Sequence, residues 1–172
     1  MILTGAKIKE EINNGNINIF PFLENQINPN SYNYRLGSHI KVFYKFDGNK
    51  SLFKKVKIPK KGYILRPGKM YLSNTKEVIG SSKYAISLIG RSSIGRLGLF
   101  LQVSANLGHT TSCHKWTLEI VVAHPIKVYS GMVIGQVSFW KNYGNIKKYT
   151  GKYGFLNYPQ ESFTPNILIK NI

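Results

Sequence analysis

Turn-forming residues divide this chain of 172 residues into short runs rich in valine, isoleucine, tyrosine and phenylalanine. The dividing segments include Asn-Gly, Asp-Gly-Asn, Pro-Lys-Lys-Gly, Arg-Pro-Gly-Lys and Tyr-Ser-Gly-Met. Many short β-prone runs at close spacing are typical of a sandwich or barrel. We therefore predict a mainly β, jelly-roll or barrel fold, with strands over 40–44, 62–65, 70–72, 84–88, 100–103, 116–122 and 134–140.

A helix is predicted at the N-terminus. Thr4 can cap it, Ile8 and Ile12 fall on one face, and Asn14-Gly15 ends it. One further helical turn is expected over 92–96, where the chain leaves a strand.

Length and composition indicate one domain over residues 1–172, because 42% hydrophobic residues in 19.5 kDa can fill a single core. Cys113 is the single cysteine, which excludes an internal disulfide framework and fits a reducing compartment. No apolar run approaches the roughly 20 residues of a membrane span, and the first residues lack a signal-peptide pattern. We expect a cytoplasmic protein with no membrane partner.

The formal net charge of +17, from 24 basic and 7 acidic residues, favours an anionic partner. Nucleotides, nucleic acid and acidic membrane surfaces all carry the required charge. The lysines are spread along the chain with small clusters, instead of being concentrated on one reading face, which argues against specific nucleic-acid binding. A lysine-rich, solvated surface without a dedicated partner remains the alternative.

The segment Gly90–Gly98, Gly-Arg-Ser-Ser-Ile-Gly-Arg-Leu-Gly, has the composition of an anion site. Its two arginines, two hydroxyls and three glycines can offer bidentate cations, short donors and open backbone N–H groups to phosphates. Glu119 follows in the otherwise apolar run 117–122, where a carboxylate is costly unless it is used or paired. Glu119 is therefore either a catalytic group or one half of a structural ion pair with Arg91 or Arg96.

Five segments, in this order along the chain, resemble the dCTP deaminase branch of the dUTPase superfamily. They are 27–37 (INPNSYNYRLG), 90–98, 117–125 with its Thr-Leu-Glu and Pro125, 131–139 (GMVIGQVSF) and 149–153 (YTGKY). The resemblance implies a distorted jelly roll that assembles as a homotrimer with shared active sites. It also implies that residues 143–172 form a flexible lid that covers the nucleotide, with dCTP as the substrate.

Hydrolytic deamination without metal needs a carboxylate whose pKa is raised by desolvation, so that it can take and return protons near neutral pH. By resemblance, Glu119 is this general base and acid, Ser92 and Arg96 position the water and the base, and the Ala105 carbonyl orients the water. Zinc deaminases carry H-x-E and P-C-x-x-C motifs, and this chain has neither. We expect no zinc, and Mg²⁺ only as the ion carried by the triphosphate.

The resemblance also implies a set of nucleotide-binding residues from the glycine-rich segment, the region around Glu119 and the lid. They are Arg91, Ser92, Ser93, Arg96, Asn106, His109, Thr117, Leu118, Glu119, Tyr149, Lys152 and Gln160.

Three positions depart from the family pattern. His109 stands where the family has an aspartate, ten residues before the glutamate, that contacts the sugar and in some members helps activate a water at the α-phosphate. Asn33 and Asn106 each replace a residue that can carry charge. Because a mostly uncharged histidine is a weak anchor for a metal-bound water, we expect dUTP and ammonia as the products.

Three alternatives stay open. The first is a bifunctional deaminase and diphosphatase that forms dUMP, and the second is a deaminase of another cytidine nucleotide. The third belongs to a different class: a nucleotide-binding regulator or basic nucleic-acid binder on the same scaffold.

Overall fold

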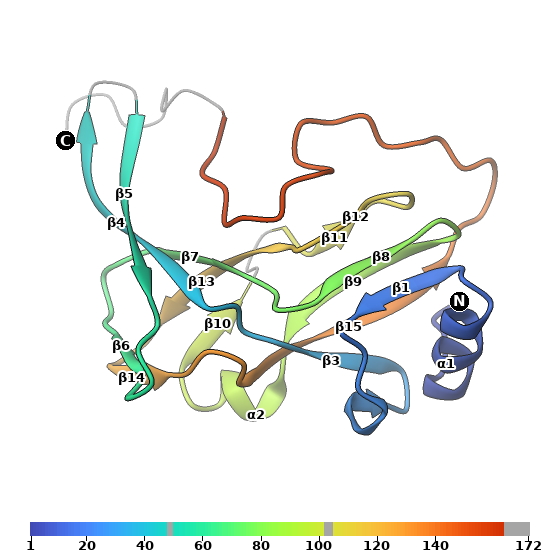
Figure 1. Cartoon of the computed structure of the whole chain (residues 1–172), viewed down its shortest axis with the longest axis horizontal. Coiled ribbons are helices and arrows are strands. Elements are labelled where there is room, and N and C mark those ends of the chain that lie inside the picture. Colours follow the sequence, from blue (N-terminus) through green and yellow to red (C-terminus); the bar gives the residue numbers. More distant parts are fainter. Residues whose placement is uncertain (48–49, 102–104, 164–172) are drawn as a thin grey trace.

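The structure, a computed structural model, describes residues 1–47, 50–101 and 105–163 and is mainly β (Figure 1). Two five-stranded sheets build most of it, and every strand pair in them is antiparallel. One sheet has the order β11 (Leu107–Gly108), β9 (Tyr84–Gly90), β15 (Val133–Lys141), β3 (Ser31–Arg35), β2 (Ile27–Asn28). The other has the order β10 (Leu99–Leu101), β13 (Thr117–Val122), β7 (Tyr71–Asn74), β4 (His39–Asp47), β5 (Lys50–Lys57).

Smaller elements complete the described part of the fold. A three-stranded sheet has the order β1 (Ile17–Phe20), β8 (Val78–Ser81), β12 (Cys113–His114), and β14 (Ile126–Val128) pairs with β6 (Tyr63–Leu65). The helices are α1 (Gly5–Asn13), the 3₁₀ turn η1 (Glu24–Gln26) and the short α2 (Ser92–Gly95). Both predicted helical segments are confirmed.

All seven predicted strands have counterparts, although residues 102 and 103 of the fifth lie outside the described part of the chain. The prediction missed several others, notably β1, β3, β5 and β8. The charge of β5 explains its omission, because four lysines in eight residues hide its alternation. No described helix is long and apolar enough to cross a membrane, and the cytoplasmic location stays a prediction.

Apolar side chains from both large sheets form one core. Tyr32, Val137 and Phe139 enter it from the first sheet, and Leu118 and Ile120 enter it from the second. The alternation of buried and less buried residues along β13 follows from the two-residue period of a strand. Every second residue of β13 therefore faces away from the core.

A buried ion pair between Arg35 and Glu77 joins the two large sheets. Arg35 ends β3, and its backbone N–H and Nε both donate to the Glu77 carboxylate. Glu77 is fully buried in the connection from β7 to β8. The adjacent Lys76 N–H donates to the Arg35 carbonyl at 2.7 Å, which fixes the β7 end of one sheet against β3 of the other.

Helix α1 begins where the Thr4 hydroxyl accepts a hydrogen bond from the Lys7 N–H at 3.3 Å. It ends at Asn14, followed by Gly15 with a φ of 72°, a conformation that favours glycine. Glu11, on its buried face, is 2% exposed.

Glu11 is expected to make the stability of the fold depend on acid pH. Burial alone would raise its pKa, but hydrogen bonds from Lys7, Asn16 and Tyr84 and the charge of Lys83 lower it to about 2. A depressed pKa means that ionised Glu11 stabilises the fold above about pH 4.5, the ordinary value, and that this contribution is lost as pH falls toward 2. Glu11→Gln should destabilise the fold near pH 7 by about 1–3 kcal/mol.

Denaturant unfolding between pH 7 and pH 3 checks this, with Glu10→Gln as the matched control because the Glu10 side chain is 57% exposed. The free-energy difference between wild type and Glu11→Gln should shrink toward pH 3. A difference that stays constant with pH would contradict the assignment.

Candidate active site

Strand β13 presents Glu119 to a large cavity. The strand lies between β10 and β7, and Glu119 stands opposite Leu72 of β7. Because Leu118 and Ile120 point into the core, Thr117 and Glu119 must share the opposite face. Hydrogen bonding on both sides of β13 fixes this direction, so Glu119 cannot turn away without breaking the sheet.

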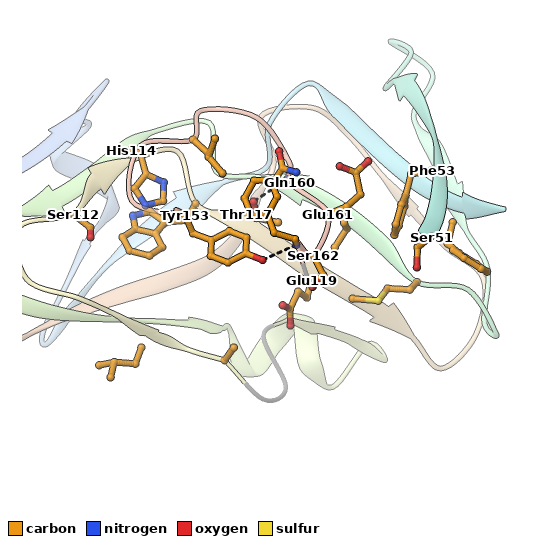
Figure 2. Close-up of a pocket in the computed structure, with 18 of the residues that line it drawn as sticks. Ser51, Phe53, Ser112, His114, Thr117, Glu119, Tyr153, Gln160, Glu161 and Ser162 are labelled. Carbon is orange, nitrogen blue, oxygen red and sulfur yellow. Dashed lines mark hydrogen bonds between the residues drawn. The ribbon is translucent and has the colours of Figure 1, made fainter. Parts of the chain in front are cut away.

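The cavity has a volume of about 1270 Å³ and lies between β13, the β4–β5 hairpin, the loop before β12 and the C-terminal segment 149–163 (Figure 2). Its lining comprises Phe43, Phe46, Ser51, Leu52, Phe53, Met70, Leu72, Ala105, Leu107, His109, Ser112, His114, Trp116, Thr117, Glu119, Tyr149, Tyr153, Leu156, Gln160, Glu161, Ser162 and Phe163. The lining is thus apolar and aromatic, with a few polar groups, as in many ligand pockets.

A break in strand register builds the apolar end of this cavity. Phe43 and Phe46 on β4 are three residues apart and would face opposite sides of a regular strand. The pairing of β4 with β5 shifts between Phe43 and Lys45, which leaves Tyr44 unpaired. Both phenylalanines therefore line the cavity, their ring centroids 4.6 Å apart, with Phe53 of β5 at 5.8 Å from Phe43.

Two hydrogen bonds and an ion pair hold the C-terminal segment along the edge of the cavity. The Gln160 N–H donates to the Thr117 hydroxyl at 3.1 Å, and the Lys115 N–H donates to Asn157 Oδ1 at 3.0 Å. Lys41 of β4 pairs with Glu161 at 2.7 Å. The segment therefore lies across the cavity and is joined to both of its walls (Figures 1 and 2).

Residues 109–111 hold the start of this segment. Thr111 has a φ of 76°, a left-handed conformation that is an outlier for a β-branched residue and costs about 1–3 kcal/mol. Its hydroxyl accepts a hydrogen bond from the Tyr149 N–H at 3.0 Å. The Tyr149 ring stacks on His109, with 4.7 Å between ring centroids.

His114, the last residue of β12, forms a hydrogen bond with the C-terminal segment. It is buried, and its ring centroid lies 4.2 Å from that of Trp116. Burial lowers the pKa of His114, and hydrogen bonds with the backbone carbonyls of Lys115 and Leu156 partly offset this. A neutral imidazole has one N–H to donate, so it can satisfy one of the two carbonyls.

Six of the predicted site residues line the cavity: Ala105, His109, Thr117, Glu119, Tyr149 and Gln160. Three others do not. Asn106 is exposed and donates to the Ser87 hydroxyl at 3.3 Å, the Leu118 side chain is fully buried in the core, and Lys152 is exposed.

The glycine-rich segment does not reach this cavity within one chain. Its residues Arg91, Ser92, Ser93 and Arg96 lie on and beside α2, which is on the other side of the β13 sheet from segment 149–163 (Figure 1). Glu119 makes no ion pair with Arg91 or Arg96, and in the described residues its carboxylate has no salt-bridge partner. A structural ion pair between Glu119 and Arg91 or Arg96 is therefore not formed within one chain.

Several residues that line the cavity are not among the site residues predicted from the sequence. These are the phenylalanines of β4 and β5, His114, Trp116, Tyr153 and Glu161. Figure 2 shows the Glu119 and Glu161 carboxylates pointing in opposite directions. In the described residues, no group of three or more His, Cys, Asp or Glu side chains is arranged to hold a metal ion.

A family model described as dCTP deaminase-like matches residues 2–142. The chain belongs to the dCTP deaminase-like family. Among its relatives, a protein from Hathewaya histolytica named dCTP deaminase, dUMP-forming, is 43% identical over 89% of this chain and 91% of its own length. A protein of the same name from Cytophaga hutchinsonii is 40% identical over 99% of this chain and 98% of its own length.

The fold has a counterpart among solved structures. The crystal structure of 2′-deoxycytidine 5′-triphosphate deaminase from Agrobacterium tumefaciens matches with a TM-score of 0.67 and 23% identity. The match covers 82% of this chain but 48% of that longer chain. This likeness supports the predicted dUTPase-like jelly roll, and the family membership confirms the resemblance stated from the sequence.

The Lys41–Glu161 pair is expected to hold the C-terminal segment over the cavity. The two side chains are 18% and 29% exposed, so the attraction is less screened than on an open surface. Lys41→Gln should raise the rate of amide hydrogen exchange in residues 156–163 by about three- to tenfold, the equivalent of roughly 1 kcal/mol. Lys45→Gln, an exposed lysine on the same strand, is the control. Equal exchange in both variants would show that the ion pair does not hold the segment.

Proposed function

We propose that this protein hydrolytically deaminates dCTP at C4 of the cytosine ring and releases dUMP. The observation that carries the proposal is Glu119, a partly buried carboxylate without a salt-bridge partner among the described residues, fixed on a central strand and directed into a large cavity. Such a group is poised for proton transfer instead of structural pairing. Relatives with 40–44% identity carry the name dCTP deaminase, dUMP-forming.

Glu119 acts as general base and then as general acid. It takes a proton from a water molecule, whose oxygen attacks C4 of the base, and it returns protons to the ring nitrogen and to the departing amine. The carbon–nitrogen bond breaks, and ammonia leaves. Ala105 and Gln160 line the same cavity, and we infer that they orient the water and the base.

The position of α2 supports a homotrimer with shared sites. Among the described residues, the cavity lining contains no lysine or arginine, yet a triphosphate needs cations. Arg91, Ser92, Ser93 and Arg96 offer such groups, but they lie away from Glu119 of their own chain. We infer that α2 of a neighbouring copy supplies Ser92 and Arg96 to the cavity and holds the nucleotide with Arg91 and Ser93.

We replace the prediction of dUTP as the end product with dUMP. The prediction of dUTP rested on His109, which lines the cavity, but similar relatives are named as dUMP-forming. We infer that water also attacks the α-phosphorus, so that the bond to the β-phosphate breaks and pyrophosphate leaves. We propose that Mg²⁺ enters with the triphosphate and that the protein itself needs no zinc, because the sequence has neither the H-x-E nor the P-C-x-x-C motif of zinc deaminases.

Glu119→Gln tests the proposal. The variant should lose deamination by more than about a hundredfold while dCTP affinity stays within about tenfold, because other residues hold the phosphates. The assay incubates each protein with dCTP and Mg²⁺ and resolves ammonia, dUTP, dUMP and pyrophosphate. The wild type should produce dUMP and pyrophosphate with ammonia. A variant that keeps more than a few per cent of the activity would remove Glu119 from the mechanism.

Shared sites predict complementation between two inactive variants. Glu119→Gln keeps an intact α2, whereas Ser92→Ala/Arg96→Ala keeps an intact Glu119. When both chains are co-expressed in equal amounts and assemble randomly into closed trimers, about a quarter of the sites should combine an intact Glu119 with an intact α2. The fraction of such sites sets the activity that is recovered. Each variant expressed alone is the control. No recovery in verified mixed trimers would place α2 and Glu119 of one chain in one site.

A further inference from the structure

A second cavity of about 510 Å³ adjoins the first. It is lined by Ala85, Leu107, His109, Thr110, Asn142, Asn145, Ile146, Lys147, Lys148 and Tyr149. Three of these residues, Leu107, His109 and Tyr149, also line the cavity that holds Glu119. The stacked rings of His109 and Tyr149 therefore form a common wall between the two spaces.

The two cavities differ in charge. In the described part of the chain, the first is lined by Glu119 and Glu161 and by no lysine or arginine. The second is lined by Lys147 and Lys148 and, within the same residues, by no carboxylate. A neutral base and sugar suit the first environment, whereas a phosphate chain with several negative charges suits the second.

The two lysines are available for an anion. Among the described residues, neither Lys147 nor Lys148 takes part in an ion pair. Beside them, Asn142 Nδ2 donates to Thr110 Oγ1 at 2.9 Å and to the Lys83 carbonyl at 3.0 Å. These bonds hold Asn142 and Thr110, which line the cavity, and the Thr111 hydroxyl holds Tyr149, the residue that follows the lysines.

We propose that the second cavity is a phosphate subsite of the same nucleotide site, in which Lys147 and Lys148 bind the distal phosphates of the substrate. The inference rests on the proposed function, because it needs the base to lie beside Glu119. The phosphate chain then passes the edge of the His109–Tyr149 stack. Its far end meets the two lysines, and α2 of a neighbouring copy meets the rest.

This subsite makes the number of phosphates a determinant of affinity. In the proposed arrangement only the distal phosphates meet the lysines, so a monophosphate gains nothing from them. A triphosphate gains charge-assisted hydrogen bonds, which are weakened by exposure and by salt. The lysines therefore select for triphosphates over monophosphates carrying the same base.

The test compares Lys147→Ala/Lys148→Ala with Lys60→Ala/Lys61→Ala. The control removes the same charge from a second adjacent lysine pair, which is exposed in the connection between β5 and β6. Isothermal titration calorimetry in the presence of Mg²⁺ gives the affinities of dCTP, dCMP and inorganic tripolyphosphate. The assays use full-length protein with Glu119→Gln in the background, so that dCTP is not consumed during the titration.

The proposal expects Lys147→Ala/Lys148→Ala to weaken dCTP binding by about tenfold, the equivalent of roughly 1.4 kcal/mol. Binding of dCMP should be unchanged, and the Lys60/Lys61 variant should bind both nucleotides like its parent. Tripolyphosphate should compete with dCTP. An unchanged dCTP affinity, or the same loss in both double variants, would overturn the subsite.

Two further outcomes are informative. One distinguishes the phosphates of the substrate from those of a separate effector, and the other distinguishes failure of the subsite from failure of the proposed reaction. If tripolyphosphate binds through Lys147 and Lys148 together with dCTP, the cavity holds a separate phosphate-bearing effector, and the proposal is wrong. If wild-type protein fails to deaminate dCTP while dCTP affinity still depends on the two lysines, the subsite stands and the proposed reaction fails.

Discussion

The buried pair of Arg35 and Glu77 is the constraint on which the position of the active site depends. It joins β3 of one large sheet to the turn that follows β7 of the other. Thr75, two residues before Glu77, accepts a hydrogen bond from the Trp116 N–H and donates its own N–H to the Trp116 carbonyl. Trp116 immediately precedes β13, so the ion pair and these two bonds set where β13 begins and which face carries Glu119.

The sequence was sufficient for the features that depend on neighbouring residues. The cap at Thr4, the end of α1 at Asn14 and the alternation that exposes Glu119 beside buried Leu118 all follow from local patterns. The bulge at Tyr44 does not, because a strand pattern carries no sign of the register shift that turns Phe46 into the cavity. The family resemblance named six residues that line the cavity around Glu119, but nothing in the sequence places α2 away from them.

The sequence also could not predict how the C-terminal segment is held. Two of its tethers join a main-chain N–H to a side-chain oxygen, as between Gln160 and Thr117, and such contacts have no periodicity. The left-handed Thr111 shows what this arrangement costs. A glycine would adopt this φ without strain, but it would leave the Tyr149 N–H without its hydroxyl acceptor. The strain at Thr111 is therefore offset by a contact that fixes the wall shared by both cavities.

The same division into two spaces explains how a chain with a net charge of +17 can contain a cavity to whose lining the described residues contribute no lysine or arginine. Phosphates need cations at short range. Lys147 and Lys148, on the other side of the His109–Tyr149 stack, and the arginines on and beside α2 offer such cations. On this view the stacked rings of His109 and Tyr149, which line both cavities, separate the two environments.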